Sequence, residues 1–179
     1  MIELKKPAGH KLWAKLYSLY LSAFPAAERK PWWMIRKMHR AGKTDIWCIM
    51  HEESFAGLAI TINGPDTILL DYFAVEKKCR GQGIGRSALK AILERYEGKH
   101  FFLEIESTNA QTAKNMPTRL RRKAFYLSCG LREMHTEATL FGVKMELLGN
   151  GCHLDYNDYK AFYRDNYNQW AANHITPAE

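Results

Sequence analysis

The sequence has few cysteines, and none of them form a closely spaced pair. Its 179 residues contain four, Cys48, Cys79, Cys129 and Cys152, which are widely scattered. A zinc site or a disulfide framework needs cysteines at short, regular spacings, so neither is indicated. We therefore expect no metal cofactor and a reducing compartment, the cytoplasm.

Long hydrophobic runs are also missing. Charged residues interrupt every apolar run near the N-terminus, among them Lys5, Lys11 and Lys15, which is not the pattern of a secretory signal. No stretch approaches the roughly 18 apolar residues of a membrane span. The chain length is typical of one domain with a substantial core. These features predict a protein with no membrane partner.

Acidic residues are fewer than basic ones, and the formal charge is +7. A basic chain can bind nucleic acid or hold a polyanionic cofactor. The basic residues are dispersed, apart from the run Arg119-Leu120-Arg121-Arg122-Lys123, and no nucleic-acid motif is present. Dispersed charge is typical of a solvated surface, so nucleic-acid binding is the less favoured alternative.

The order of periodic segments predicts a mixed sheet flanked by helices, an α/β (α+β) fold. Turn residues at Glu52-Glu53 and at Asn63-Gly64-Pro65-Asp66 separate three of the strands. We expect helices over 8–23, 31–42, 84–96, 120–129 and 155–171, and strands over 45–51, 54–63, 67–75, 101–106, 131–135 and 138–148. Residues 107–118 are expected to form a loop, and Gly130 to cap the helix before it.

The last helix carries an aromatic stripe at helical spacing, with Tyr156, Tyr159, Phe162, Tyr163, Tyr167 and Trp170. Such a stripe is more typical of a docking face than of a ligand site. We therefore expect a catalytic or binding domain over residues 1–150. Residues 151–179 would form a helix that packs on the same domain or on the partner of a homodimer.

A glycine-rich segment, Arg80-Gly81-Gln82-Gly83-Ile84-Gly85, follows the strand-like run 67–75 and opens an amphipathic helix. Glycines leave several backbone N–H groups open to one anion, and a helix N-terminus adds unpaired donors and a positive dipole end. The segment therefore predicts a cradle for a diphosphate.

Spacing excludes two familiar phosphate loops. A Walker A loop needs Gly, four residues and then Gly-Lys-Ser/Thr, whereas Gly85 is followed by Arg86-Ser87. A dinucleotide fingerprint needs Gly-x-Gly-x-x-Gly directly after a strand, but position 86 is Arg and five residues separate Val75 from the first glycine.

Two segments resemble motifs of the GNAT superfamily, the acyl-CoA-dependent N-acetyltransferases. The first is Tyr72-Phe73-Ala74-Val75 followed by the glycine-rich segment, which is similar to the family's Gln/Arg-x-x-Gly-x-Gly/Ala signature. The second comprises Arg122, Phe125, Tyr126, Gly130 and Leu131, and the element order is similar over about residues 8–148. One departure is Arg119, where the family often has a cofactor-binding Asn; Asn109 or Asn115 could supply that amide.

The resemblance implies a V-shaped splay between strands 67–75 and 101–106, with acetyl-CoA as the acyl donor. Pantetheine would pair with the backbone around Ala74, at Phe73 and Val75, and the Phe73 N–H would polarise the thioester carbonyl. The pyrophosphate would lie on the N–H groups of Gln82, Gly83, Ile84, Gly85 and Arg86, beside Gly81. Arg80 or Arg86 would add charge, with plain solvent exposure as the alternative for both.

The resemblance also makes Tyr126 the acid that protonates the departing thiolate, because a phenol is a suitable donor to a basic leaving group. The alternative is a tyrosine that packs its helix on the sheet. For the base, Glu104 and Glu106 lie on one face of their strand, and Asp71 is the only charge in an apolar strand. Glu104 or Glu106 is preferred, acting directly or through water, and Asp71 is the rival.

Acceptor walls in this family usually come from the first two helices, which here predicts Phe24, Glu28 and Trp32. An aromatic pocket with a carboxylate suits a primary amine on a small molecule or peptide, whereas helix core is the alternative for the tryptophan. The sequence thus predicts an acetyl-CoA-dependent N-acetyltransferase. A non-catalytic acyl-CoA-binding module and a nucleic-acid-associated protein are the other classes kept open.

Overall fold

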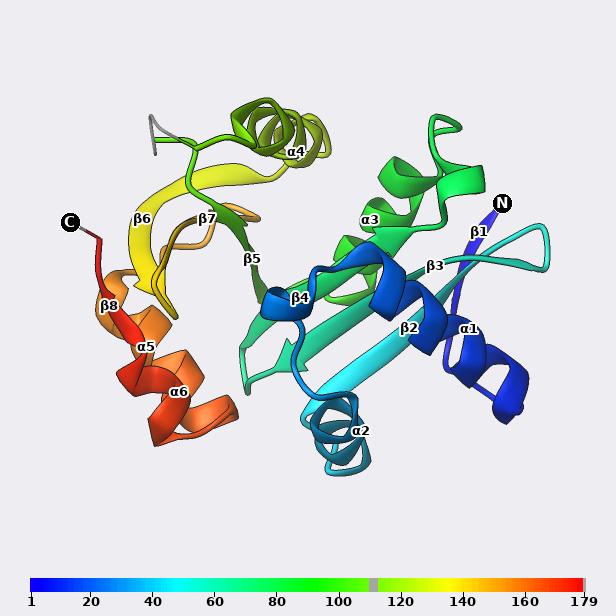
Figure 1. Cartoon of the computed structure of the whole chain (residues 1–179), viewed down its shortest axis with the longest axis horizontal. Helices are drawn as coiled ribbons and strands as arrows, with labels where there is room; N and C mark the ends of the chain where they lie inside the picture. The colour runs from blue at the N-terminus through cyan, green and yellow to red at the C-terminus, as the bar shows by residue number, and fades with distance from the viewer. Residues whose placement is uncertain (110–112, 179) are drawn as a thin grey trace. The chain divides into compact units, whose positions relative to one another are not determined.

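The structure is a computed structural model that describes residues 1–109 and 113–178. Its described residues form a mixed α/β fold with an eight-stranded, mostly antiparallel sheet flanked by helices (Figure 1). The strand order is β1-β2-β3-β4-β5-β7-β6-β8. The fold class predicted from the sequence is confirmed, and the splay between two of its strands stays a prediction.

The chain divides into two compact units, which are described separately. The first unit comprises residues 1–63 and 70–97, and the second comprises residues 64–69 and those from 98 onward. The first unit contains β1 (Ile2–Lys5), α1 (Gly9–Ala23), α2 (Trp32–Arg40), β2 (Thr44–His51), β3 (Ser54–Asn63), most of β4 (Thr67–Val75) and α3 (Ile84–Arg95), with short 3-10 helices at Ala26–Glu28 and Lys77–Cys79.

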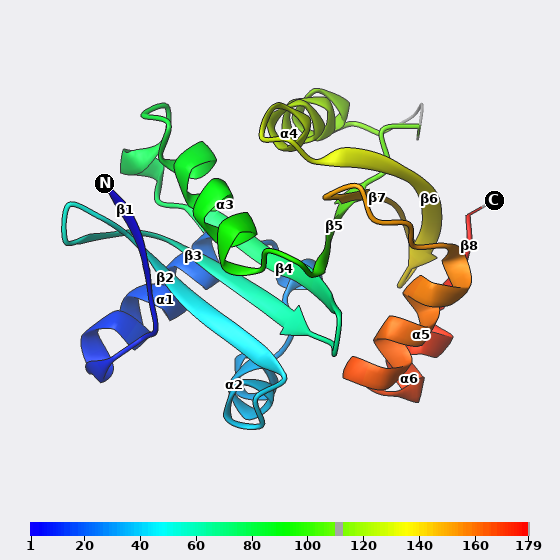
Figure 2. The ribbon, with the colours of Figure 1, turned by 180° about the vertical axis from the view of Figure 1, so that it is seen from behind.

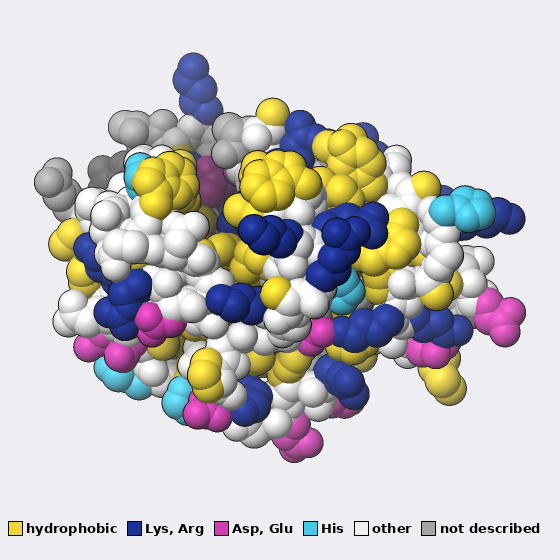
Figure 3. Space-filling model, turned by 90° about the horizontal axis from the view of Figure 1, so that it is seen from below, with side chains coloured by type: hydrophobic (Ala, Val, Ile, Leu, Met, Phe, Trp, Pro, Cys, Tyr) yellow, Lys and Arg dark blue, Asp and Glu magenta, His cyan; other side chains and the backbone are white. Residues whose placement is uncertain are grey.

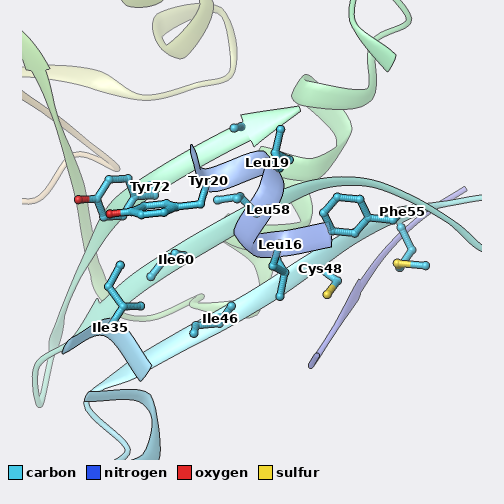
Figure 4. Packing of buried hydrophobic residues seen from close by; sticks show 12 residues of the cluster. Leu16, Leu19, Tyr20, Ile35, Ile46, Cys48, Phe55, Leu58, Ile60 and Tyr72 are labelled. Atoms are coloured by element: carbon cyan, nitrogen blue, oxygen red, sulfur yellow. The ribbon is translucent and has the colours of Figure 1, made fainter. Parts of the chain in front are cut away.

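Helices cover both faces of the strands in the first unit. Helices α1 and α2 lie on one face, and α3 lies on the other (Figures 1 and 2). The first face buries alternate residues of each strand, as the two-residue period of a strand requires. Its core comprises Leu16, Leu19 and Tyr20 from α1, Ile35 from α2, and Ile46, Cys48, Leu58, Ile60 and Tyr72 from the strands (Figure 4).

A tight turn joins β2 to β3, as predicted. Glu52 and Glu53 have φ values of 49° and 63°, which matches a two-residue hairpin turn whose central residues are both left-handed. Ile49 and Met50 of β2 pair with Gly57 and Phe55, so the register shifts here and β3 carries one extra residue, Ala56. The hairpin holds β3 beside β2 and fixes which residues face the core.

The second unit contains an antiparallel set of strands and three helices. Strand β7 pairs with β5 and β6, and β6 also pairs with β8. Its elements are β5 (His100–Glu106), α4 (Met116–Ser128), β6 (Arg132–Leu140), β7 (Val143–Gly149), α5 (Tyr156–Asn166), α6 (Gln169–Asn173) and β8 (Ile175–Pro177). Gly130, with a φ of 95°, follows the end of α4, which confirms the predicted cap.

The last two long strands differ from the prediction. Residues 132–140 form one strand, and the turn lies at Phe141-Gly142, not at residues 136–137. Phe141 and Gly142 have positive φ values of 48° and 80° and join the pair Leu140 and Val143. The apparent break near residue 136 is a bulge, because His135 has a φ of 56° and the register shifts between Glu133 and Glu137.

The helices of the second unit also differ from the prediction. Helix α4 begins at Met116, four residues early, because Pro117 in its first turn favours helix initiation. The predicted C-terminal helix is two helices, since the Asn168 side chain accepts a hydrogen bond from Ala171 N (2.8 Å) and starts α6 anew. The short strands β1 and β8 were not predicted.

Candidate functional site

The glycine-rich loop has the backbone geometry that its sequence predicts. Gly81 and Gly83 have φ values of 76° and 75°, and both are exposed. Helix α3 begins at Ile84, and its first hydrogen bond runs from Ser87 N to Gly83 O (3.1 Å). As in any helix, the N–H groups of Ile84 and Gly85 have no acceptor within the helix. The exposed loop therefore leads into the helix N-terminus, where backbone donors lie at a positive dipole end.

Two side chains tie this loop to the strand before it. The Arg80 Nε atom donates to Val75 O (3.1 Å), and the Gln82 Nε2 atom donates to Lys78 O (2.9 Å). The 3-10 helix at Lys77–Cys79 fills the spacer between strand and glycines. Arg80 and Arg86 are both exposed, so each could meet an anion on the loop.

The final residues of β4 alternate between the core and a less buried face. Tyr72 and Ala74 are buried, whereas Phe73 and Val75 are only partly buried. In the neighbouring strand β3, Gly57 approaches so closely that an added Cβ would lie 2.4 Å from Ala74 O. Glycine at position 57 therefore lets β4 lie close to β3 in the segment predicted to pair with pantetheine.

Asp71 forms a buried ion pair. Its side chain is 5% exposed, and its Oδ1 atom lies 2.5 Å from the Lys30 ammonium. Tyr72 holds the same segment, because its hydroxyl donates to Glu28 O (2.9 Å) and accepts from Lys30 N (3.0 Å). Tyr20 donates to Lys30 O (2.8 Å). The connection between α1 and α2 is thus fastened to the strand that carries Asp71.

The predicted acceptor walls include a compact aromatic group. Phe24 and Trp32 pack against the core cluster, with ring centroids 4.9 Å from Tyr72 and 5.1 Å from Tyr20, respectively. Burial raises the pKa of Tyr20 to about 12 and raises the pKa of Tyr72 further, so both phenols stay neutral at physiological pH. Glu28 is exposed and contributes its backbone carbonyl to the contact with Tyr72.

Tyr126 lies in the last part of α4 and is partly buried. Its ring stands edge-on to Phe125, with centroids 5.2 Å apart. Burial raises the pKa of Tyr126 to about 12, although the nearby Arg122 acts in the opposite direction. The phenol therefore keeps its proton at neutral pH, which is the state that a proton donor needs.

Glu106 is neutralised by arginine. Its Oε1 atom accepts from Arg119 Nη2 (2.6 Å), and its Oε2 atom accepts from Asn115 Nδ2 (3.0 Å). Arg119 also donates to Ser107 O (2.9 Å), so it links α4 to the residue that follows β5. Asn109 donates to Glu137 (2.6 Å). Arg119 thus has a structural role at the position where the family often has Asn.

Glu104 accepts hydrogen bonds from side chains of helix α5. The hydroxyls of Tyr159 and Tyr163 both donate to its Oε1 atom, each at 2.7 Å. Both tyrosines are buried, at 0% and 1% exposure, and Glu104 is partly buried. Of the three carboxylates proposed as the base, Asp71 and Glu106 are ion-paired and Glu104 accepts two hydroxyl bonds.

Sequence reasoning missed the partners of these carboxylates. A lone Asp in an apolar strand indicates a partner, but nothing local identifies Lys30, which is 41 residues away. The four-residue spacing of Tyr159 and Tyr163 was a usable signal, because residues at i and i+4 lie on one face of a helix. Hydrophobic docking alone accounts for such an aromatic stripe, so the sequence does not show that the two hydroxyls meet a carboxylate.

No group of His, Cys, Asp or Glu side chains in the described residues is arranged to hold a metal ion. None of the described helices combines the length and apolarity that crossing a membrane requires. On the face that Figure 3 shows, Lys and Arg side chains lie in small groups with uncharged surface between them.

A mixed, mostly antiparallel sheet and a glycine-rich loop at a helix N-terminus define an α/β protein with an anion-binding type of loop. The sequence matches the acetyltransferase (GNAT) family over residues 13–130. The chain therefore belongs to the GNAT family of acetyltransferases. The comparison with curated proteins found no match.

Solved structures share the fold at low sequence identity. A GNAT-family protein from Bacteroides thetaiotaomicron is 17% identical with a TM-score of 0.77, over 94% of this chain and 98% of that one. A Bacillus subtilis acetyltransferase in complex with CoA is 15% identical with a TM-score of 0.57, over 83% and 95%. A GNAT acetyltransferase from Elizabethkingia anophelis with acetyl-CoA bound is 17% identical with a TM-score of 0.55, over 83% and 95%.

Proposed function

We propose that this protein transfers the acetyl group of acetyl-CoA to a primary amine of a small molecule or peptide, by direct attack in a ternary complex. The observation that carries the proposal is the exposed glycine loop at the start of α3, where Gly81 and Gly83 take left-handed conformations. Family membership supports the transfer of an acyl group. The acceptor class is argued from the carboxylates and aromatic side chains described above.

Acetyl-CoA is proposed as the donor because the loop suits a diphosphate. The N–H groups from Gln82 to Arg86 would bind the pyrophosphate, beside the exposed Arg80 and Arg86 side chains. Two structurally similar proteins contain CoA or acetyl-CoA, which supports the same cofactor here. The backbone of Phe73 and Val75, on the less buried face of β4, would pair with pantetheine.

In the proposed reaction, the neutral amine attacks the carbonyl carbon of the thioester and the C–S bond breaks. The Phe73 N–H would stabilise the negative charge that develops on the carbonyl oxygen. Tyr126 would give its proton to the departing thiolate, and its raised pKa keeps that proton available at neutral pH. A carboxylate, directly or through water, would take the proton that the amine loses.

The described partners rank the three proposed bases. Glu106 is the weakest candidate, because ion pairing with Arg119 favours the unprotonated carboxylate and opposes proton uptake. Asp71 is likewise paired with Lys30. Glu104 accepts hydrogen bonds from two hydroxyls, those of Tyr159 and Tyr163. We therefore favour Glu104 as the carboxylate that meets the amine, with Asp71 as the rival.

The acceptor would contact the connection between α1 and α2. Phe24 and Trp32 offer aromatic surface, and Glu28 adds an exposed carboxylate. Aromatic faces attract ammonium groups, so this composition favours a cationic acceptor. Most Lys and Arg residues are dispersed along the sequence and no nucleic-acid motif is present, which favours this reading over nucleic-acid binding.

A thermal-shift experiment with paired glycine variants tests the proposed cofactor site. Acetyl-CoA at about 100 times its Kd should stabilise the fold by about 2.7 kcal/mol and raise Tm by several degrees. Gly83→Ala should weaken this stabilisation, because a Cβ at a φ of 75° strains the loop that presents the N–H groups. Gly98→Ala is the matched control, since Gly98 has a φ of 81° and equally open surroundings after the other end of α3.

Thiol release from acetyl-CoA across a panel of primary amines then separates catalysis from binding. Stabilisation by acetyl-CoA without amine-dependent thiol release would support the non-catalytic acyl-CoA-binding alternative. Stabilisation by DNA or RNA, and not by acetyl-CoA, would support the nucleic-acid alternative. Equal loss of acetyl-CoA stabilisation in the Gly83 and Gly98 variants would show that backbone strain alone is responsible and that the loop does not bind the donor.

A further inference from the structure

Helix α5 carries two tyrosines whose hydroxyls converge on one atom. The helix begins with a reciprocal cap, in which Asp155 Oδ1 accepts from Asp158 N (2.8 Å) and Asp158 Oδ2 accepts from Asp155 N (3.3 Å). Tyr159 and Tyr163 follow one turn apart, and both hydroxyls lie 2.7 Å from Glu104 Oε1. Helix α5 lies beyond residues 13–130, the range that matches the family.

Packing fixes the positions of both hydroxyls. The rings of Tyr159 and Tyr163 stand edge-on at 5.2 Å, and Phe102 of β5 lies edge-on to Tyr159 at 6.2 Å. Tyr167 stacks on Tyr163 with centroids 4.8 Å apart. Because both rings are buried among neighbours, the hydroxyls have little freedom to move away from Glu104. The carboxylate group is therefore held in one orientation.

This geometry favours a charged, fixed carboxylate. Hydrogen bonds of 2.7 Å from a hydroxyl to a carboxylate are in the strong, charge-assisted range. Hydroxyl donors to a carboxylate oxygen favour the ionised form of such a group. Glu104 is only partly buried, so the side chain keeps access to the surface of the unit. A carboxylate of this kind attracts a cation more strongly than a mobile, solvated one does.

We propose that Glu104, held by Tyr159 and Tyr163, is the site that receives the primary ammonium group of the acceptor. The two tyrosines are positioning residues, and α5 is thereby a part of the acceptor site. The inference rests on the proposed acetyltransferase function and deepens it, because it assigns acceptor selection to a helix outside the family match. Acceptors whose reacting end is uncharged at neutral pH would bind this site poorly.

Binding of two small probes tests the ammonium site without catalysis. In amide NMR titrations, n-butylammonium should shift the signals of Leu103, Glu104 and Ile105 at concentrations where n-butanol has little effect. The Tyr159→Phe/Tyr163→Phe double variant should weaken n-butylammonium binding about tenfold, because the carboxylate loses both fixing bonds. Tyr156→Phe is the matched control. Tyr156 lies on the same helix as the two tyrosines, but its hydroxyl donates to Ile175 O (3.0 Å).

Kinetics with an amine that the wild-type protein acetylates provide the second measurement. Each single Tyr→Phe variant should raise the acceptor KM roughly five- to tenfold, with the acetyl-CoA KM and kcat within about twofold of wild type. Glu104→Gln should raise the acceptor KM at least as much, because it keeps the hydroxyl contacts and loses the charge. Tyr156→Phe should behave as the wild type in every constant.

Three results on acceptor binding would overturn the inference. They are an equal response to n-butylammonium and n-butanol, an unchanged acceptor KM in the double variant, and an equal loss in Tyr156→Phe. A loss confined to kcat in the tyrosine variants would also overturn it, because Tyr159 and Tyr163 would then support the proton transfer proposed for Glu104 and not the binding of the ammonium group. If n-butylammonium binds as expected but no amine is acetylated, the acetyltransferase proposal fails while the ammonium site stands.

Discussion

Single residues in this protein gain their chemistry from long-range partners. Asp71 and Lys30 are 41 residues apart, and Glu104 and Tyr159 are 55 residues apart, yet each pair is in hydrogen-bond contact. Removing one partner from a buried pair leaves a charge without compensation, which costs several kcal/mol. The ion pair of Asp71 therefore opposes its use as a base, because a proton taken from the amine would weaken the contact with Lys30.

Tyr126 is the residue whose proposed role is tested most simply. Replacing it with Phe removes the proton donor and keeps the ring that packs against Phe125. We expect Tyr126→Phe to lower kcat for thiol release about 100-fold or more, with the acetyl-CoA KM little changed, because a general acid acts in the transition state. Stopped-time thiol assays on a confirmed acceptor provide the measurement.

The Tyr126→Phe variant should melt within a few degrees of the wild type, since no hydrogen bond from its hydroxyl is recorded among the described residues. A kcat equal to that of the wild type would show that water or another group protonates the thiolate. A parallel fall in kcat and in melting temperature would instead indicate that the tyrosine serves packing.

At the scale of elements, the sequence predicted those that have strong local signals. Helix α3 begins at the predicted residue because Gly83 interrupts the chain just before a clear apolar period. The hairpin at Glu52-Glu53 is also correct, since two apolar segments rich in strand-forming residues flank a polar pair. The glycine loop belongs to this class, so its geometry could be predicted although its ligand remains a proposal.

The missed elements depend on contacts between distant segments. The bulge at His135, which has a positive φ, breaks the alternation of residues along β6. In the sequence, such a break is hard to distinguish from a turn. Strands β1 and β8 are only four and three residues long, too short to give a local pattern. They are defined by their pairing with β2 and β6, respectively. The partners of Glu104 were missed because α5 meets β5 only in the folded chain.

Gly57 offers a test at this scale. An alanine Cβ at position 57 would lie 2.4 Å from Ala74 O and 3.3 Å from the Val75 Cα, so β3 and β4 must separate locally. We expect Gly57→Ala to destabilise the fold by about 1–3 kcal/mol, as overpacking does, and to weaken acetyl-CoA binding. Urea unfolding and an acetyl-CoA titration of the same samples measure the two effects.

Gly42→Ala is a suitable comparison for Gly57→Ala. Gly42 has a φ of 73° and open surroundings, so its alanine variant is strained without any steric contact in the sheet. It should lose stability and keep the acetyl-CoA affinity of the wild type. The role assigned to the close approach of β3 and β4 would be rejected if Gly57→Ala bound acetyl-CoA as tightly as the wild type.

At the scale of the whole molecule, a partly buried polar network joins the elements of the first unit. Asp45 Oδ2 accepts from Tyr96 Oη (2.8 Å) and from Asn63 Nδ2 (2.8 Å), and the other oxygen accepts from Lys6. Trp47 Nε1 donates to Tyr96 Oη (3.0 Å). The network connects the segment after β1 with β2, β3 and the end of α3. It therefore links the pH to the stability of a whole unit.

Burial alone would raise the pKa of Asp45, but hydrogen bonds from Lys6, Tyr96 and Asn63 lower it below its ordinary value. A carboxyl with a lowered folded pKa adds stability at pH values above its unfolded pKa of about 4, and this stability is lost as the pH falls through the folded pKa. We expect the free energy of unfolding to fall below about pH 4. In Asp45→Asn it should start about 1–3 kcal/mol lower at pH 7 and decline less steeply in acid.

Urea unfolding between pH 7 and pH 2 measures both slopes, and Asp165→Asn is the control. Asp165 also has a lowered pKa, through its bond from Arg164, but it lies on the surface, where such pairs contribute little to stability. Asp165→Asn should therefore follow the wild-type curve. If Asp45→Asn declined as steeply as the wild type below pH 4, the acid sensitivity would have to come from other carboxylates, such as Glu137, whose pKa is also lowered.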